Sequence, residues 1–274
     1  MIGVRPEARS RRVDPVLMDG AVAVVVGSGA GIGREIALRM GAEGADVVLA
    51  GRSVPPMEEV AGLLREQGRR ALVVPTDLRD PDAVAALADR AVGEFGRVDA
   101  LVANSGVGGP TKPLTEIDLD EWHDTFAVNV TGTFLCLKAF LPHMQRAGSG
   151  SVVVIGSITG KRPLRDRTPY AASKMALVGL VRTAAVESGP HGVRINLVSP
   201  GGVEGPRLDW VIANQATSQG ITEDQARRQF ADGSPLGRLV TARDVADTAV
   251  FLSSARAGAT IGEDVNVAAG LVMY

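Results

Sequence analysis

The chain reads Ala21-Val-Ala-Val-Val-Val26 and continues directly into Gly27-Ser28-Gly29-Ala30-Gly31-Ile32-Gly33. The first segment is a continuous apolar run, which predicts a strand buried on both faces. The second is a glycine-rich turn, which lets the backbone approach a diphosphate closely at the N-terminus of the helix that starts near Ile32. Flexible linkers are also glycine-rich, but dinucleotide binding requires such a turn between a strand and a helix, near the start of the domain. The turn therefore predicts a dinucleotide site.

Outward from this turn, short apolar runs alternate with helical patterns. The runs are continuous rather than alternating, as in parallel strands covered on both faces. This alternation predicts a single α/β domain, a Rossmann-like doubly wound parallel sheet of about seven strands with helices on both faces. The predicted strands are Ala21–Val26, Asp46–Ala50, Ala71–Pro75, Val98–Ala103, Ser151–Ile155, Val193–Val198 and Asp264–Val267. The predicted helices start near Ile32 and span Met57–Gln67, Asp80–Phe95, Leu119–Arg146, Pro169–Ser188 and Ala242–Ser253.

Two segments differ from this pattern. Residues 205–239 carry helical patterns without a strand, which predicts a helical substrate-loop insertion beside the site. Residues 1–16 contain four arginines and no apolar core of the kind that a signal peptide needs, so we expect a flexible N-terminal tail. The single dinucleotide-binding and catalytic domain then spans residues 17–274.

The composition argues against several classes of protein. A formal net charge of −2 and a pI near 6.0 do not suggest a nucleic-acid partner. No apolar run reaches the roughly 18–20 residues of a membrane span. The one cysteine, Cys136, lies in an apolar helical stretch and excludes an internal disulfide framework, and three dispersed histidines lack metal-site spacing. We expect a cytoplasmic protein with no membrane partner and no metal.

The end of the second predicted strand commonly selects the dinucleotide. An acidic residue there accepts a hydrogen bond from a ribose 2′-hydroxyl, whereas an arginine accommodates a 2′-phosphate. The chain reads Leu49-Ala50-Gly51-Arg52-Ser53, without an acid, so Arg52 favours NADPH over NADH. The alternative is that Arg52 stacks on adenine or is solvated and that NADH serves. Asp77, after the third strand, is placed to contact the adenine region.

A tyrosine and a lysine lie four residues apart in Tyr170-Ala-Ala-Ser-Lys174, and Ser157 lies thirteen residues upstream. On a helix, residues i and i+4 share a face. A tyrosine titrates near pH 10, and an ammonium about 4 Å away supplies about the 4 kcal/mol that lowers its pKa by about three units. Tyr170 is therefore a candidate general acid/base. Ser157 is placed to bind the same substrate oxygen. The alternative is an ordinary helix with one aromatic residue and one solvated lysine.

In order and spacing these motifs resemble those of the short-chain dehydrogenase/reductase family, from about Leu17 onward. The matching segments are Val26–Gly33, Ala103-Asn104-Ser105-Gly106, Asn129 in Asn-Val-Thr-Gly, Ser157, Tyr170 with Lys174, and Pro200-Gly201. Three departures are Ala103 and Ser105 in the second motif, Gly205 where the family often has a threonine that holds the carboxamide, and Ala268-Ala269-Gly270 where it has Asp-Gly-Gly.

The resemblance implies a mechanism. Tyr170 exchanges a proton with the substrate oxygen, Lys174 lowers the tyrosine pKa and binds ribose hydroxyls, and Ser157 polarises the carbonyl. Asn129 shapes its helix and holds a water in a proton relay, and the cofactor exchanges hydride with the substrate carbon. The residues expected to bind cofactor are Gly27, Ser28, Gly29, Gly31, Ile32, Gly33, Arg52, Asp77, Leu78, Asn104, Gly106, Tyr170, Lys174, Pro200, Gly201 and Val203.

The substrate is a small-molecule carbonyl or alcohol of unspecified identity. The stretch 158–169 carries four basic residues and one acidic residue, and it is expected near the mouth of the site. This pattern leaves open a polar or anionic substrate, a solvated loop or an oligomer contact. Arg162, Arg207 and Trp210 are the candidate substrate contacts, and Arg207 and Trp210 lie at the start of the insertion.

Two alternative functions and the oligomeric state remain open. The same residues would serve an NAD-dependent alcohol dehydrogenase, because catalyst and geometry are shared by both directions. A non-catalytic dinucleotide-binding sensor is the third reading, and the complete Asn129, Ser157, Tyr170 and Lys174 set argues against it. The resemblance also implies a homotetramer or homodimer that packs through the helices around Asn129 and Tyr170.

Overall fold

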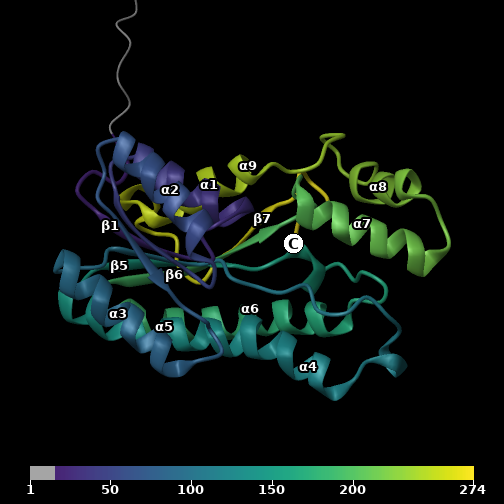
Figure 1. Cartoon of the computed structure of the whole chain (residues 1–274), viewed down its shortest axis with the longest axis horizontal. Helices are drawn as coiled ribbons and strands as arrows, with labels where there is room; N and C mark the ends of the chain where they lie inside the picture. The colour runs from purple at the N-terminus through teal and green to yellow at the C-terminus, as the bar shows by residue number, and fades with distance from the viewer. Residues whose placement is uncertain (1–15) are drawn as a thin grey trace, which may run out of the picture.

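Seven parallel strands form one sheet in the order β3-β2-β1-β4-β5-β6-β7 in the computed structural model, which describes residues 16–274 (Figure 1). The strands are β1 Val22–Val26, β2 Asp46–Gly51, β3 Ala71–Pro75, β4 Ala100–Ala103, β5 Gly150–Ile155, β6 Val193–Pro200 and β7 Asp264–Val267. The helices are α1 Gly31–Ala42, α2 Val54–Glu66, α3 Pro81–Phe95, α4 Leu119–Phe126, α5 Gly132–Ala147, α6 Thr168–Ser188, α7 Pro206–Gln219, α8 Glu223–Ala231 and α9 Ala242–Ser253.

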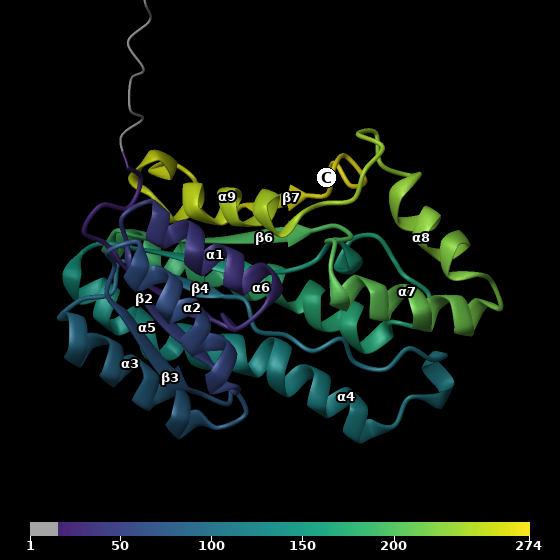
Figure 2. The same ribbon diagram turned by 45° about the horizontal axis from the view of Figure 1, so that its top comes forward.

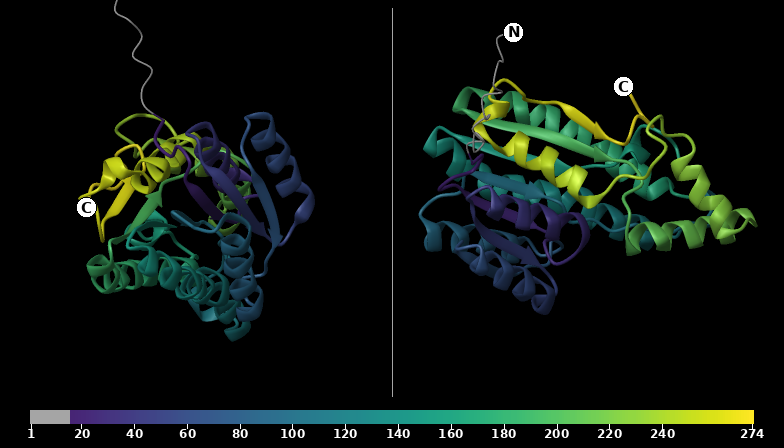
Figure 3. Two further views of the ribbon diagram at one scale, coloured as in Figure 1. Left: turned by 90° about the vertical axis from the view of Figure 1, so that its left-hand side faces the viewer. Right: turned by 90° about the horizontal axis from the view of Figure 1, so that it is seen from above.

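Helices cover both faces of the sheet, and successive residues of each strand enter different cores. In β1, Val24 and Val26 pack into the core beneath α3, α5 and α6. Ala23 and Val25 pack into the core beneath α1, α2 and α9. Because both faces are buried, every position of β1 is apolar, which explains the continuous run in the sequence. Figures 1 and 3 show the sheet between these two helical layers.

The order of the strands reverses at β1. This strand pairs with β2 on one side and with β4 on the other, and chain connections leave in opposite directions from this point. In open α/β sheets, the crevice at the carboxyl ends of such strands is where ligands bind. The fold therefore places the glycine-rich turn after β1 and the segment after β4 on the two sides of one crevice.

The predicted elements agree with the structure apart from details that have local causes. Helix α2 begins at Val54, three residues before the predicted start, because Pro55 and Pro56 lie in its first turn, where proline is tolerated. The predicted helix Leu119–Arg146 is divided by a five-residue π-helical turn, Ala127–Thr131. Such turns are rare and often occur at functional sites.

The stretch 205–239 contains two helices and no strand, as predicted. Helices α7 and α8 extend beyond the carboxyl end of β6 (Figure 2). They share a small apolar core of their own, which consists of Leu208, Ile212, Ala216 and Ala226. Helix α7 begins after Gly205, whose φ of 130° is a conformation that other residues rarely adopt. Residues 1–15 of the predicted tail lie outside the described residues.

One helical region, Leu119–Ala147, is long and apolar enough to cross a membrane by length and composition alone. It qualifies by its average hydropathy and not by an unbroken apolar run. Its side chains Cys136, Phe140 and Met144 are completely buried in the core beneath the sheet. The region therefore has the packing of a core helix, and its length alone is weak support for a membrane span.

Candidate active site

The predicted site residues converge at the carboxyl ends of four adjacent strands. The glycine-rich turn follows β1, Asn104 follows β4, Ser157 follows β5 and Gly201 follows β6. Tyr170 and Lys174 lie in the first two turns of α6, and Asn129 lies in the π-helical turn before α5. Residues separated by more than 150 positions are thereby collected around one crevice because parallel strands end at the same edge.

The glycine-rich turn leaves no room for side chains where it meets the sheet. A Cβ at position 33 would lie 2.0 Å from the Gly27 carbonyl oxygen and 2.5 Å from the Asn104 amide nitrogen. Gly27 and Gly31 have φ values of 80° and 54°, which glycine adopts at little cost. The turn thus brings bare backbone to the N-terminus of α1, where the helix dipole favours a diphosphate. This cradle fits a dinucleotide.

Hydrogen bonds fix the turn to both neighbouring strands. The Gly27 and Ser28 amides donate to the Ala50 carbonyl at the end of β2, at 2.7 and 3.3 Å. The Asn104 side chain donates to the Gly27 carbonyl at 2.9 Å. Asn104 therefore supports the turn from the side of β4, and this contact between residues 77 positions apart is not visible in the sequence.

The ends of β2 and β3 bear charges where the adenosine half of a dinucleotide would lie. Asp77 accepts a hydrogen bond from the Arg79 amide at 3.0 Å. This bond, against the effect of burial and together with the charges of Arg79 and Arg52, lowers the pKa of Asp77. Arg52 is exposed at the end of β2, and Leu78, behind Asp77, is buried and packs against Gly132 at the start of α5.

Asn129 holds the loop that follows β4. Its side-chain oxygen accepts from the Val107 amide at 2.8 Å, and its side-chain nitrogen donates to the Val107 carbonyl at 3.1 Å. The same nitrogen donates to Ser173 Oγ at 3.0 Å, which joins the loop to α6. All three contacts are within the protein, so Asn129 is placed as a positioning residue for the loop around Gly106.

Tyr170 and Lys174 share one face of α6 as their spacing predicts. The Lys174 ammonium lies 5.8 Å from the centre of the Tyr170 ring and donates to the Ile155 carbonyl at 2.9 Å. Burial by itself would raise the pKa of Tyr170, but the charges of Lys174, Arg207 and Arg167, with a hydrogen bond to Ser157, outweigh it and lower this pKa. Burial also lowers the pKa of Lys174.

Ser157 lies two residues after the end of β5 and is held by Thr159. Its hydroxyl oxygen accepts from the Thr159 amide at 3.1 Å, and the hydroxyl lies 3.1 Å from Thr159 Oγ1. Ser157 lies close enough to Tyr170 to help lower the pKa of its phenol, so two hydroxyl groups are near each other at this edge of the sheet. Such a pair can bind a single carbonyl or alcohol oxygen and exchange a proton with it.

The residues expected to line the nicotinamide follow β6. A Cβ at Gly201 would lie 3.0 Å from the Ala268 backbone, so a larger residue there would fit only if its neighbour moved slightly. Val203 forms an isolated bridge with Val240 and anchors the start of the segment that leads to α7. Gly205, where the resemblance leads one to expect a threonine, is the residue before α7, and its positive φ supplies a conformational reason for the glycine.

Of the three predicted substrate contacts, the structure brings two to Tyr170. The Arg207 guanidinium carbon lies 5.7 Å from the ring of Tyr170. Trp210 packs on Arg167, whose guanidinium carbon lies 5.6 Å from the indole and 5.0 Å from the Tyr170 ring. Arg162 instead is exposed and lines a separate surface cavity of about 680 Å³ beside α8.

Arg167 was not predicted as a substrate contact, although its charge contributes to the basic character of the stretch 158–169. It precedes Tyr170 by three residues, and residues i and i+3 at the start of a helix share a face. That spacing is the signal that could have selected it. Its side chain is only 2% exposed, so it is buried beside the candidate acid/base and not solvated as the alternative held.

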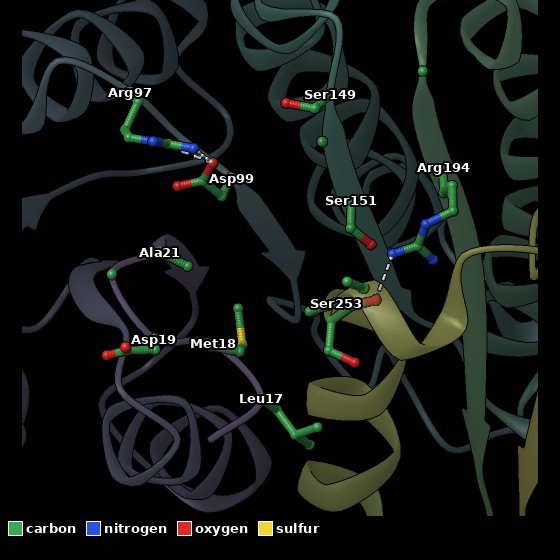
Figure 4. A pocket seen from close by; sticks show the side chains of 15 residues that line it. Leu17, Met18, Asp19, Ala21, Arg97, Asp99, Ser149, Ser151, Arg194 and Ser253 are labelled. Carbon is green, nitrogen blue, oxygen red and sulfur yellow. Dashed lines mark hydrogen bonds and ion pairs between the residues drawn. The ribbon is translucent and has the colours of Figure 1, made fainter. Parts of the chain in front are cut away.

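A cavity of about 410 Å³ lies at the opposite end of the sheet (Figure 4). Its residues lie before or at the start of β1, β4, β5 and β6 and at the end of α9, and it shares none of them with the candidate site. Several of its polar groups have internal partners: Ser151 Oγ donates to the Leu252 carbonyl, and Arg194 donates to the Ser254 carbonyl. Arg97 forms an ion pair with Asp99. These contacts fasten the end of α9 to the sheet.

Known proteins match this chain over nearly its full length. A family model described as enoyl-(acyl carrier protein) reductase matches residues 26–272. The cis-4-hydroxycyclohexanecarboxylate dehydrogenase of Sinomonas cyclohexanicum is 39% identical over 241 residues, which are 88% of this chain and 92% of that protein.

Solved structures of dehydrogenases share the fold. An NAD+-bound xylitol dehydrogenase superposes with a TM-score of 0.90 at 27% identity, covering 92% of this chain and 99% of that one. A 7α-hydroxysteroid dehydrogenase complexed with NADH and 7-oxo glycochenodeoxycholic acid has a TM-score of 0.86 at 31% identity, covering 94% of this chain and 96% of that one.

Proposed function

The chain belongs to the short-chain dehydrogenase/reductase family, whose members here oxidise alcohols or reduce carbonyls with a nicotinamide dinucleotide, and from this premise we propose that Tyr170 is its general acid/base and NADP(H) its cofactor. The observation that carries the proposal is the position of Tyr170. Against the effect of burial, the charges of Lys174 and Arg207, with a contribution from Ser157, lower the pKa of its hydroxyl. A phenol whose pKa is lowered releases a proton more readily than an ordinary tyrosine and can regain it from the substrate oxygen.

Each residue then has a role that its contacts support. Tyr170 donates a proton to the substrate oxygen during reduction and accepts it during oxidation. Ser157 binds the same oxygen and holds it against the phenol. Lys174 stabilises the phenolate and reaches the ribose hydroxyls. Asn129 fixes the loop through its paired hydrogen bonds with Val107. The bound dinucleotide supplies or accepts the hydride.

The cradle that would hold the dinucleotide consists of the turn 27–33, Asn104 and the N-terminus of α1. Asp77 and Leu78 line its adenine side, and Arg52 faces the position of a 2′-phosphate. The exposed guanidinium of Arg52 supports NADPH, because the segment Gly51–Ser53 carries no acid to bind a 2′-hydroxyl. NAD is the alternative, and it is favoured by the NAD+ and NADH named with two related structures.

We infer that the substrate is a secondary alcohol on a ring or its ketone. Two relatives support a ring. One is named for a hydroxylated cyclohexane and the other is complexed with an oxo steroid acid. Trp210, packed beside Tyr170 through Arg167, supplies an aromatic wall on which a ring can lie. Helices α7 and α8 would then serve as the loop that encloses the substrate.

A substrate panel with both cofactors tests the proposal. The panel contains cyclic and open-chain secondary alcohols, their ketones and one enoyl thioester, each assayed with the NAD and the NADP form of the cofactor. We expect turnover of cyclic alcohols or ketones, with a higher kcat/KM for the NADP form. Tight binding of a dinucleotide without turnover of any compound would favour a sensor and contradict the proposal.

We also propose a homotetramer or homodimer that forms through α5 and α6. Phe134 on α5 is 45% exposed, and Met175 and Val186 on α6 are 51% and 78% exposed, although all three are apolar. Exposed apolar groups on two adjacent helices are typical of subunit interfaces. Analytical ultracentrifugation should therefore give a multimer, and Val186→Glu should weaken it. A cytoplasmic location stays a prediction.

A further inference from the structure

Arg167 is a buried cation without a buried anion. Its side chain donates to Thr111 Oγ1 at 3.0 Å and to the Gly108 carbonyl at 2.9 Å, and both acceptors are neutral. Its Nε is buried and has no partner. No acidic side chain among residues 16–274 forms an ion pair with it. Burying an unpaired charge is costly, so the guanidinium charge calls for a partner that comes from outside the chain.

A second cation without an ion pair, Arg207, also lies near Tyr170, and its side chain is exposed. Arg207, at the start of α7, donates to the Gly106 carbonyl at 2.9 Å and forms no ion pair within the described chain. The guanidinium carbons of Arg167 and Arg207 lie 5.0 and 5.7 Å from the centre of the Tyr170 ring. Burial, and less strongly the charge of Arg207, lower the pKa of Arg167, and the nearby Tyr170 opposes them only in part. An anion between the two groups would relieve this repulsion.

Lys174 adds a third cation, so that one phenol faces three positive side chains. Ionisation of Tyr170 supplies one negative charge and leaves the two arginines uncompensated. Lowering the pKa of a tyrosine requires one nearby ammonium, which Lys174 already provides. The arginines therefore exceed what proton transfer alone requires.

The other basic residues of the loop before α6 are used elsewhere. Lys161 forms a nearly buried ion pair with Asp264 at 2.6 Å. Arg165 is exposed and lies 3.8 Å from Asp166. Asp166 adopts a left-handed conformation with a φ of 62°, and Gln215 of α7 donates to the Arg165 carbonyl. Because the turn around Asp166 is held in this way, Arg167 is the basic residue of this loop that lies beside Tyr170.

We propose that Arg167 and Arg207 form a carboxylate subsite, and that the substrate is a hydroxy or oxo acid whose acid group binds between them while its reacting carbon lies at Tyr170. Paired guanidinium groups bind a planar carboxylate with charge-assisted hydrogen bonds. Trp210 lies beside the proposed subsite, packed on Arg167 and close to Gly108. The inference rests on the proposed function, because it concerns the acid group of the same substrate whose alcohol or ketone would react at Tyr170.

The first test compares 4-oxocyclohexanecarboxylate with its primary amide, which has the same shape without the charge. We expect the wild-type kcat/KM to be at least about tenfold higher for the acid. Arg207→Gln should remove most of this preference, so that the ratio of the kcat/KM values for acid and amide falls toward one even if the altered charge near Tyr170 changes both values. Arg165→Gln, in the same loop but exposed, should leave both values unchanged. Equal values for acid and amide in the wild type would overturn the subsite.

The second test measures binding without turnover. Cyclohexanecarboxylate and cyclohexanecarboxamide have no ketone or alcohol group to react, and their affinities for the dinucleotide-loaded protein are measured by calorimetry. We expect tighter binding of the carboxylate and at least about a tenfold loss in Arg167→Gln and Arg207→Gln. Weaker dinucleotide binding in Arg207→Gln, with no acid preference in the wild type, would reassign this arginine to the cofactor.

The two tests separate failure of the subsite from failure of the proposed function. Turnover of neutral ketones, with no preference for acids in either test, leaves the oxidoreductase intact and overturns the subsite. Tight binding of the carboxylate with no turnover of any ketone or alcohol supports the subsite and overturns the assigned chemistry. Unfolding midpoints of both arginine variants show whether they retain the native fold.

Discussion

Asn129 binds the backbone of Val107 at both its N–H and its carbonyl, at 2.8 and 3.1 Å. The amide oxygen and the amide nitrogen are thus both used, and the nitrogen also reaches Ser173 on α6. The π-helical turn 127–131 contains Asn129, and its wider geometry differs from that of the helices on either side. One side chain therefore ties the loop after β4 to the helix that carries Tyr170.

Replacement of this amide should loosen the site and the fold together. In Asn129→Ala the Val107 N–H and carbonyl lose their partners, and an unsatisfied buried group costs about 1–3 kcal/mol. We expect a comparable drop in the free energy of urea unfolding, with a lower kcat. Thr131→Ala, which truncates an exposed side chain in the same turn, is the control. A wild-type unfolding midpoint for Asn129→Ala would contradict this role.

Substitution of Gly33 tests whether the glycine-rich turn binds the dinucleotide. A methyl group at this position would overlap the Gly27 carbonyl oxygen, 2.0 Å away, so the turn must shift. We expect Gly33→Ala to lower stability by about 1–3 kcal/mol and to raise the dissociation constant of NADPH, measured by fluorescence titration. Gly62→Ala is the matched control, because nothing lies within 4 Å of its Cβ, and it should leave binding unchanged. Unaltered affinity in Gly33→Ala would place the dinucleotide elsewhere.

Tyr170 can be tested against the other tyrosine of the chain. Tyr170→Phe removes only the hydroxyl, so the fold and dinucleotide binding should persist while kcat falls by about 10²–10⁴-fold, the usual contribution of a general acid/base. Tyr274→Phe removes the hydroxyl of a residue that is 79% exposed and should have wild-type kinetics. Near-wild-type turnover by Tyr170→Phe would exclude the assignment.

The fold followed from the sequence because its determinants are local. A strand buried on both faces is a continuous apolar run, and a turn that touches bare backbone needs glycine. The shared site of Tyr170 and Lys174 could also be predicted from the sequence, because their spacing of four residues places them on one helical face.

The features that the sequence did not show depend on contacts between distant segments. Asn104 supports the Gly27 carbonyl across 77 positions. Arg167 turns inward because Asp166 and the α7 residue Gln215 fix the loop before it, whereas a count of loop charges does not distinguish inward from outward. The π-helical turn around Asn129 has no compositional signature, so a single long helix was the natural prediction.

The pH dependence should report the lowered pKa of Tyr170. Burial raises this pKa, but the opposing charges, led by Lys174, bring it below its ordinary value of 10.0. Alcohol oxidation requires the phenolate, so its kcat/KM should rise with pH through an inflection below 10.0 and then level off. Carbonyl reduction requires the neutral phenol and should fall through the same inflection.

Removal of the ammonium should move that inflection upward. In Lys174→Met the phenolate loses its principal stabilising charge, so oxidation should need a higher pH. Lys138→Met, which removes an exposed lysine on α5, should retain the wild-type profile. Coincident profiles for Lys174→Met and the wild type would mean that Lys174 does not tune the phenol.

Arg52 decides between the two dinucleotides. It is exposed at the end of β2, and a 2′-phosphate there would gain a charge-assisted contact worth about 1.5–3 kcal/mol, which corresponds to about 10- to 150-fold in affinity. Arg52→Gln should therefore reduce kcat/KM with NADPH by at least about tenfold and leave the value with NADH within about twofold. Arg90→Gln, an exposed substitution on α3, is the control for general charge effects. If Arg52→Gln lowers kcat/KM equally with NADPH and NADH, Arg52 contacts a part that both cofactors share, such as the adenine. That result would favour NAD as the cofactor.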